Sequence, residues 1–218
     1  GVLDPDVPPN LCVPGKAEVA AVVAKLTGKV AEATEPKYAH IKCRGGNGIA
    51  KMAFEYKGVH DCAAAKLVQQ GPKTCKFGCL GFGNCVRACP FNAMSMGPNG
   101  LPVVDRKMCT GCGKCANTCP NHVIELLPMS AKVSVSCSSK DFGAVAMKNC
   151  KALCIGCGSC MRNCSLKEEE GVKVVDHLAI VNQDVCHHCT NATCLTKCPT
   201  GAIGEMLKGV FKKEENVG

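Results

Sequence analysis

The stretches CKFGCLGFGNCVRACP (75–90) and CTGCGKCANTCP (109–120) decide the fold of this chain. The second has the spacing Cys-x2-Cys-x2-Cys-x3-Cys-Pro, which holds [4Fe–4S] clusters in two-cluster proteins, its fourth cysteine binding the neighbouring cluster. The first is a variant, with the spacing Cys-x3-Cys-x5-Cys-x3-Cys-Pro. With the fourth cysteines exchanged, the pair predicts two clusters. Their predicted ligands are Cys75, Cys79, Cys85 and Cys119 for cluster 1, and Cys109, Cys112, Cys115 and Cys89 for cluster 2.

The same arrangement recurs in the last third of the chain as an internal repeat. CIGCGSCMRNC (154–164) repeats the regular spacing with Ser165 in place of the closing proline, and CHHCTNATCLTKCP (186–199) reads Cys-x2-Cys-x4-Cys-x3-Cys-Pro. Two further [4Fe–4S] clusters are therefore expected. Their predicted ligands are Cys154, Cys157, Cys160 and Cys198 for cluster 3, and Cys186, Cys189, Cys194 and Cys164 for cluster 4.

Five of the 21 cysteines remain outside these sets. Cys12 stands alone near the start of the chain. The other four flank the first pair of motifs, and one hypothesis is that they bind a further [4Fe–4S] cluster between the two repeats. These four are Cys43, Cys62, Cys137 and Cys150. The alternatives are buried, inert thiols, or an exchange of Cys150 with a neighbouring ligand.

Three other kinds of site fit these residues less well. A structural zinc site usually shows two separated Cys-x2-Cys pairs. The motifs here instead have three closely spaced cysteines followed by a Cys-Pro pair. Residues 150–157 contain the Cys-x3-Cys-x2-Cys spacing of radical S-adenosylmethionine enzymes, but a second cysteine repeat follows where those enzymes have a barrel. His187 and His188 resemble the histidine pair of a Rieske site, yet four cysteines already stand in that region.

The composition agrees with metal clusters as the main source of stability. The chain has 218 residues but only two Tyr, six Phe and no Trp, too few for a large aromatic core. Reduced, closely spaced thiols indicate a reducing compartment and not a secreted disulfide scaffold. Because each cluster with its thiolates carries about −2, four clusters offset the formal charge of +8, which therefore does not indicate nucleic-acid binding. The sequence shows no membrane-spanning stretch and no signal peptide.

The expected fold is α+β, with two tandem two-cluster ferredoxin-like modules at 72–129 and 150–207. A mostly helical segment (1–71) precedes them, a connector (130–149) joins them, and a charged, mobile tail (208–218) follows. A helix is expected at 16–26, before Gly28, and another at 60–70. The remaining predicted elements are strands at 38–43 and 123–127 and hairpins of 93–96 with 101–105 and of 172–175 with 178–181.

Several short stretches resemble the B subunit of the Rnf complex. They are LCVPG (11–15), CRGG (43–46), Tyr56-Lys57-Gly58 with Asp61-Cys62, CLGFGNCVRACPFNAM (79–94), NGLPVVD (99–105) and CIGC (154–157). The resemblance covers nearly the whole chain. It implies a membrane-bound ferredoxin:NAD⁺ oxidoreductase that is coupled to Na⁺ or H⁺ translocation. In such a complex this subunit is the iron–sulfur entry point on the cytoplasmic side and accepts electrons from reduced ferredoxin.

The resemblance also implies partners and a missing segment. The expected partners are reduced ferredoxin, the NADH-side subunit and the membrane subunits. Members of the family carry an N-terminal membrane helix and a small four-cysteine cluster domain, and Cys12 matches the last ligand of that domain. The chain is therefore expected to be truncated at its N-terminus. As it stands it would be peripheral, with membrane contact through a segment that it lacks.

The expected function is outer-sphere electron transfer along a row of four [4Fe–4S] clusters, or of five if the further set of cysteines binds one. No catalytic residue and no substrate pocket are predicted on this chain. One alternative is a free-standing soluble polyferredoxin, an electron carrier outside any complex. The other is an iron–sulfur subunit of a different oxidoreductase, but a dinucleotide site is not apparent, because CLGFGNC (79–85) lacks the third glycine of the Rossmann fingerprint.

Overall fold

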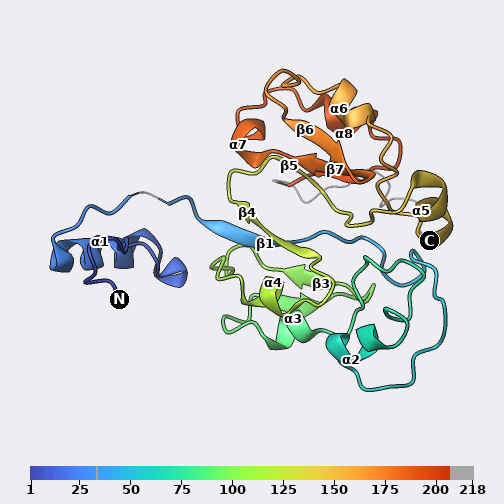
Figure 1. The fold of residues 1–218 in the computed structure, drawn as a ribbon, viewed down its shortest axis with the longest axis horizontal. Coiled ribbons are helices and arrows are strands. Elements are labelled where there is room, and N and C mark those ends of the chain that lie inside the picture. The colour runs from blue at the N-terminus through green and yellow to red at the C-terminus, as the bar shows by residue number, and fades with distance from the viewer. Residues whose placement is uncertain (33, 207–218) are drawn as a thin grey trace.

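The structure is a computed structural model that describes residues 1–32 and 34–206. Figure 1 shows two lobes, with the start of the chain lying apart from both as an N-terminal arm. The arm (1–32) contains the 3-10 helix η1 (Val13–Gly15) and the helix α1 (Lys16–Thr27), which ends at Gly28 in a left-handed conformation as predicted. No helix among the described residues has both the length and the apolar character needed to cross a membrane. The predicted tail (208–218) lies outside these residues.

The first lobe (37–128) is built on two antiparallel pairs of strands. β2 pairs with β3 as the predicted hairpin, and β4, the strand expected at 123–127, pairs with β1. The helices are short, the longest having six residues. The elements are β1 (Lys37–Ile41), α2 (Cys62–Leu67), α3 (Asn84–Arg87), β2 (Met94–Met96), β3 (Pro102–Val104), α4 (Lys114–Thr118) and β4 (Ile124–Pro128).

The second lobe (133–206) repeats this plan. β6 and β7 form the second predicted hairpin, and β5 pairs with β8 as β1 pairs with β4. The helices α6 and α8 correspond to α3 and α4, whereas α5 lies between the two lobes (Figure 1). The elements are β5 (Val133–Val135), α5 (Gly143–Asn149), α6 (Ser159–Arg162), β6 (Val172–Val175), β7 (Leu178–Val181), α7 (Gln183–Cys186), α8 (Thr193–Lys197) and β8 (Ile203–Glu205).

Each lobe takes one strand from the chain that precedes its cysteine motifs. β1 belongs to the segment expected to be mostly helical, and it lies beside β4 with His40 opposite Glu125. β5 belongs to the predicted connector, and it lies beside β8 with Val135 opposite Ile203. A pair of strands buries little apolar surface and is marginally stable by itself. The cysteine loops must therefore supply the rest of the core of each lobe.

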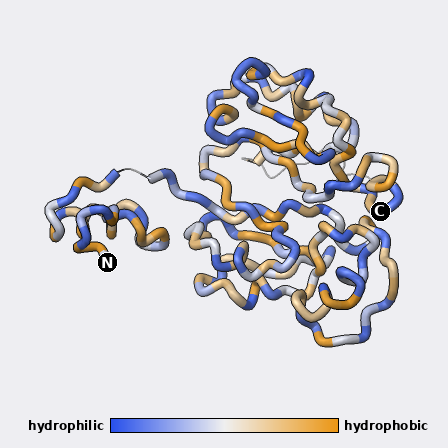
Figure 2. The backbone as a smooth tube through the Cα atoms, in the orientation of Figure 1, coloured by the Kyte–Doolittle hydropathy of each residue, from blue (hydrophilic) through white to orange (hydrophobic). Residues whose placement is uncertain are grey.

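The interior of the lobes contains few large side chains. Figure 2 shows hydrophobic segments (orange) along the strands and cysteine loops inside both lobes. The largest fully buried side chains are only Leu127, Val123, Val133 and Ser136. Thiols form a large part of both cores, as the buried cysteines of the second lobe show: Cys137, Cys154, Cys160, Cys186 and Cys194.

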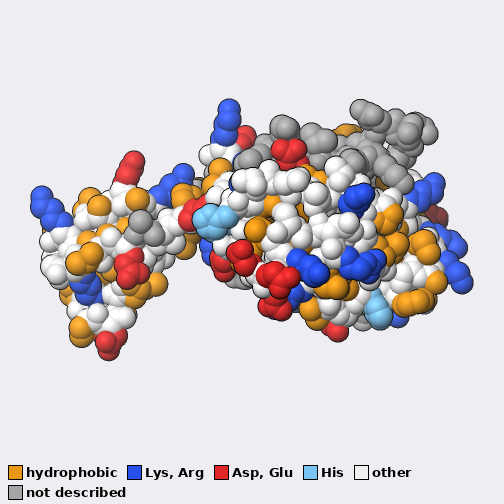
Figure 3. All heavy atoms as spheres, turned by 90° about the horizontal axis from the view of Figure 1, so that it is seen from above, with side chains coloured by type: hydrophobic (Ala, Val, Ile, Leu, Met, Phe, Trp, Pro, Cys, Tyr) orange, Lys and Arg blue, Asp and Glu red, His pale blue; other side chains and the backbone are white. Residues whose placement is uncertain are grey.

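Polar contacts hold the two lobes together. The His40 Nε2 atom lies 3.1 Å from Ser136 Oγ, and the Ser138 hydroxyl donates to the Lys42 carbonyl at 2.9 Å. Arg44 donates to the Gly201 carbonyl at 2.6 Å. A small apolar group that includes Tyr38 and Met206 lies at the same junction. On the face shown in Figure 3, acidic and basic side chains form separate small groups and not one continuous basic surface.

His40 makes the junction sensitive to acid. Burial, with smaller effects of Lys42 and Arg106, lowers the pKa of His40 from 6.5 to about 4. The folded protein therefore binds fewer protons than the unfolded chain between these values, and stability falls as the pH drops. Between pH 7.5 and 5.5 the expected loss is about 1 kcal/mol. Anaerobic thermal unfolding should show this loss in the wild type and a smaller one in His40→Gln; equal slopes would contradict the assignment.

Candidate iron–sulfur sites

Four cysteines of the first lobe meet as the sequence predicts for cluster 2. Cys109, Cys112 and Cys115 lie on the loop before α4 and in its first turn, and Cys89 follows α3. All four line one cavity. The backbone amide of Ala39, on β1, points at one of these sulfurs and donates to Cys109 Sγ at 3.4 Å. The exchange of the fourth cysteine between motifs thus places one complete set of thiols around a single cavity.

The second lobe brings together both of its predicted sets. The predicted ligands of cluster 3 line one cavity, in which Cys198 joins the three cysteines around Gly156 and Gly158. The predicted ligands of cluster 4 also lie near one another. Cys164, Cys186 and Cys189 are close enough to Cys194 for their negative charge to raise the pKa of its thiol. Burial and these neighbours raise the pKa of Cys194 to about 12.

The cavity at the predicted cluster 1 has a different fourth cysteine. Cys79, Cys85 and Cys119 line it as expected, but the fourth thiol is that of Cys62, at the start of α2. Cys75 lines a separate cavity. In the structure, Cys62 therefore stands where the motif spacing places Cys75.

Three polar contacts fix the position of Cys62. Asp61 caps α2 by accepting a hydrogen bond from the Ala64 amide at 2.9 Å. The Asn84 side chain, at the start of α3, donates to Asp61 at 2.6 Å and accepts from the Cys62 amide at 3.0 Å. These bonds join the start of α2 to the cysteine loop and hold Cys62 beside Cys85.

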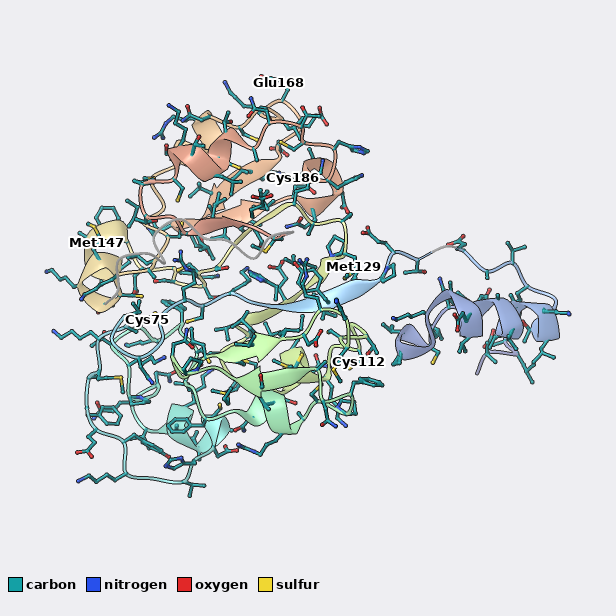
Figure 4. The ribbon with its side chains drawn as sticks, turned by 180° about the vertical axis from the view of Figure 1, so that it is seen from behind. Cys75, Cys112, Met129, Met147, Glu168 and Cys186 are labelled. Atoms are coloured by element: carbon teal, nitrogen blue, oxygen red, sulfur yellow. The ribbon has the colours of Figure 1, made fainter. Side chains whose placement is uncertain are left out.

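The second cavity lies between the lobes. Cys43, Cys75, Cys137 and Cys150 line it together with Lys73. Figure 4 shows Cys75 below α5 where the lobes meet, whereas Cys112 lies on the other side of the first lobe and Cys186 lies inside the second. The structure thus brings together three of the four cysteines in the hypothetical further set and replaces Cys62 by Cys75.

A signal for this exchange is present in the sequence. Counted back from Cys89-Pro90, the regular spacing would place ligands at 85, 82 and 79, but position 82 is Phe82. The motif therefore lacks its second cysteine and needs one from elsewhere. The Phe82 ring packs on Tyr56 and His60, with ring centroids 5.2 Å and 5.6 Å apart, and so it binds the segment that leads to Cys62.

The thiols suit a cationic metal group. Burial raises the pKa of Cys79 and of Cys160 to about 12, so these thiols stay protonated until a metal replaces the proton. Within residues 1–32 and 34–206, no three His, Cys, Asp or Glu side chains are close enough to share one metal ion. The cysteines instead surround cavities, as the ligands of a polynuclear cluster do.

Cys12, the predicted last ligand of a further N-terminal cluster, is exposed and lies at the start of η1 in the arm. His187 and His188 stack on each other with ring centroids 3.7 Å apart. Neither Cys12 nor the two histidines line any of the four cysteine cavities described above.

Comparison with known proteins identifies the family to which the chain belongs. Residues 74–123 match the 4Fe-4S dicluster domain family. The B subunit of the proton-translocating ferredoxin:NAD(+) oxidoreductase complex of Clostridium ljungdahlii is 54% identical over 99% of this chain and 75% of that protein. The B subunit of the ion-translocating oxidoreductase complex of Methanosarcina acetivorans is 37% identical over 93% of the chain and 75% of its own length. The B subunit of the Na(+)-translocating ferredoxin:NAD(+) oxidoreductase complex of Acetobacterium woodii is 38% identical over 89% of the chain and 57% of its length. With a dicluster domain and relatives this similar, the chain belongs to the family of B subunits of Rnf-type, ion-translocating oxidoreductase complexes.

Proposed function

We propose that this chain is an iron–sulfur electron-transfer subunit of an Rnf-type complex, and that it accepts electrons from reduced ferredoxin. The observation that carries the proposal is the succession of four-cysteine cavities through both lobes. Its relatives from C. ljungdahlii and A. woodii carry the name of a ferredoxin:NAD(+) oxidoreductase complex, which points to the same chemistry. Its partners would be ferredoxin and the other subunits of the Rnf-type complex. It would lie at the cytoplasmic face of the membrane.

The proposed clusters 2, 3 and 4 keep the ligands predicted from motif spacing. Cluster 1 takes Cys62 in place of Cys75, because Cys62 lines the cavity with the other three thiols. When bound, each [4Fe–4S] cluster accepts and releases one electron. The protein's part is to hold the clusters in a shell of low polarity and to direct amide hydrogen bonds at their sulfurs, as Ala39 does at Cys109. No side chain needs to form or break a bond.

Rapid mixing with reduced ferredoxin tests the proposal. The iron-loaded chain, prepared without oxygen, should oxidise reduced ferredoxin, and the low-temperature EPR signals of reduced [4Fe–4S]⁺ clusters should appear as the ferredoxin signal is lost. A sample stripped of iron is the control and should leave ferredoxin reduced. If the loaded chain is reduced by dithionite but leaves ferredoxin reduced, ferredoxin is not its donor.

A further inference from the structure

The cavity between the lobes has the features of a cluster site that no motif predicts. Its four cysteines come from four separate segments: Cys43 after β1, Cys75 at the start of the first motif, Cys137 after β5 and Cys150 after α5. Two thiols belong to the first lobe and two to the second. A group bound there would touch both lobes at once.

Glycines leave room for these sulfurs to approach one another. A Cβ atom built on Gly45 would lie 3.3 Å from Cys150 Sγ and 3.7 Å from Cys43 Sγ. One built on Gly78 would lie 3.6 Å from Cys75 Sγ and 3.8 Å from Cys43 Sγ. Three of the four thiols therefore converge on two positions without side chains, and both glycines line the cavity.

Backbone amides lie beside all four sulfurs, and two of these sulfurs accept a hydrogen bond from them. The amide of Cys79 donates to Cys43 Sγ at 3.3 Å, and that of Ser139 donates to Cys137 Sγ at 3.5 Å. The amides of Phe77 and Ala152 lie beside the sulfurs of Cys75 and Cys150, respectively. A thiol is a weak acceptor, whereas a thiolate that binds iron is a strong one, so donors at every sulfur suit cluster ligands better than inert thiols.

A buried lysine lies beside the same cavity. The Lys73 side chain donates to the carbonyls of Gly45 and Cys79, each at 2.7 Å, and the residue is only 8% exposed. Among the described residues no carboxylate forms an ion pair with Lys73. Burying an ammonium group without a negative charge nearby is unfavourable. A four-thiolate [4Fe–4S] cluster, with a charge of about −2, would supply the missing negative charge.

We propose that Cys43, Cys75, Cys137 and Cys150 bind a fifth [4Fe–4S] cluster, which passes single electrons between the two lobes. The amide of Cys79, assigned to cluster 1, donates to Cys43. The backbone amide of Cys154, assigned to cluster 3, lies beside the Cys137 sulfur. A ligand of the junction cluster thus lies beside the backbone of a ligand of each neighbour. One electron enters from one neighbouring cluster and leaves to the other, with no bond formed or broken. This inference rests on the proposed function, since it adds a step to the same relay.

Iron analysis of combined variants tests the site. The double variant Cys43→Ala/Cys150→Ala, loaded without oxygen, should contain about four fewer irons per chain than the wild type. Adding Cys75→Ala should then cause no further loss, because the cluster that Cys75 binds is already absent. Adding Cys62→Ala instead should remove about four more irons, since Cys62 belongs to cluster 1. Cys12→Ala is the matched control and should leave the iron content unchanged.

Two outcomes would overturn the proposal. An unchanged iron content in the double variant would show that the junction thiols are inert, and a further loss with Cys75→Ala would return Cys75 to cluster 1. If the double variant fails to fold, Lys73→Met decides the matter: removing the buried charge should lower the midpoint potential of one cluster without loss of iron. Potentials that do not change would then contradict the site.

Ferredoxin oxidation separates this proposal from the proposed function. In the double variant, reduced ferredoxin should still reduce the clusters of one lobe rapidly, while those of the other lobe are reduced much more slowly. Equal rates in both lobes would contradict a relay through the junction. Failure of ferredoxin to reduce even the wild type would refute the donor assignment, and the iron contents would still decide whether the junction cluster exists.

Discussion

Removing the iron will unfold both lobes. Among residues 1–32 and 34–206 the strands occur only in pairs, and a two-stranded sheet alone is marginally stable at best. The helices of the two lobes have seven residues or fewer, well below the roughly 12 residues at which an isolated helix becomes stable. Buried thiols occupy much of the space that apolar side chains fill in other proteins. Since metal binding can contribute about 10 kcal/mol to a small domain, its loss exceeds what the remaining contacts can offset.

The measurement is circular dichroism during thermal unfolding, before and after anaerobic removal of the clusters by a chelator and an oxidant. The loaded protein should unfold cooperatively, and the iron-free protein should show no transition. Restoring iron and sulfide is the control and should restore the transition. A cooperative transition that survives complete loss of iron would show that apolar packing alone holds the lobes together.

Alanine at Gly111 is expected to abolish cluster 2. Gly111 has a φ of +73°, and a Cβ atom there would lie 2.5 Å from the Lys37 carbonyl oxygen on β1. The left-handed conformation costs alanine about 1–2 kcal/mol. The overlap with backbone cannot be relieved by turning a side chain, and forcing the strand away adds about 1–3 kcal/mol. Because β1 also directs the Ala39 amide at Cys109, its displacement disturbs the cluster directly.

The same loop contains a matched control. Gly113 has a φ of +78°, but its Cβ atom would make only ordinary contact, 3.6 Å from Leu126 Cδ1. Gly113→Ala should therefore lose about 1–2 kcal/mol and keep its iron. Gly111→Ala should lose about four irons per chain. Gly156→Ala should do the same in the second lobe, where its Cβ atom would lie 2.5 Å from the His177 carbonyl oxygen. Equal iron in Gly111→Ala and Gly113→Ala would contradict this explanation.

The local elements could be predicted from the sequence because their signals are local. Turn residues mark both hairpins, and Gly28 marks the end of α1. The origin of the outer strands is different. Nothing near residues 37–41 or 133–135 shows that these strands complete the two lobes, since their partners β4 and β8 lie about 70 or more residues further along. Such long-range pairing depends on the closed fold.

The ligand sets follow the same division. Motif spacing predicts which cysteines meet at clusters 2, 3 and 4, because three ligands of each lie within nine residues of one another in the sequence. The places of Cys62 and Cys75 depend on contacts between distant segments, namely Phe82 with Tyr56 and Asn84 with Asp61. Only the cysteine missing at position 82 indicates that another segment must supply a ligand.

The most direct test of this account is the iron and acid-labile sulfide content of the wild-type chain, loaded without oxygen. Five [4Fe–4S] clusters predict about 20 irons and about 20 sulfides per chain, in equal amounts. About 16 of each would remove the junction cluster and leave the two-cluster modules in place. Zinc as the main metal, with little iron and no labile sulfide, would contradict the assignment of the cysteine cavities altogether.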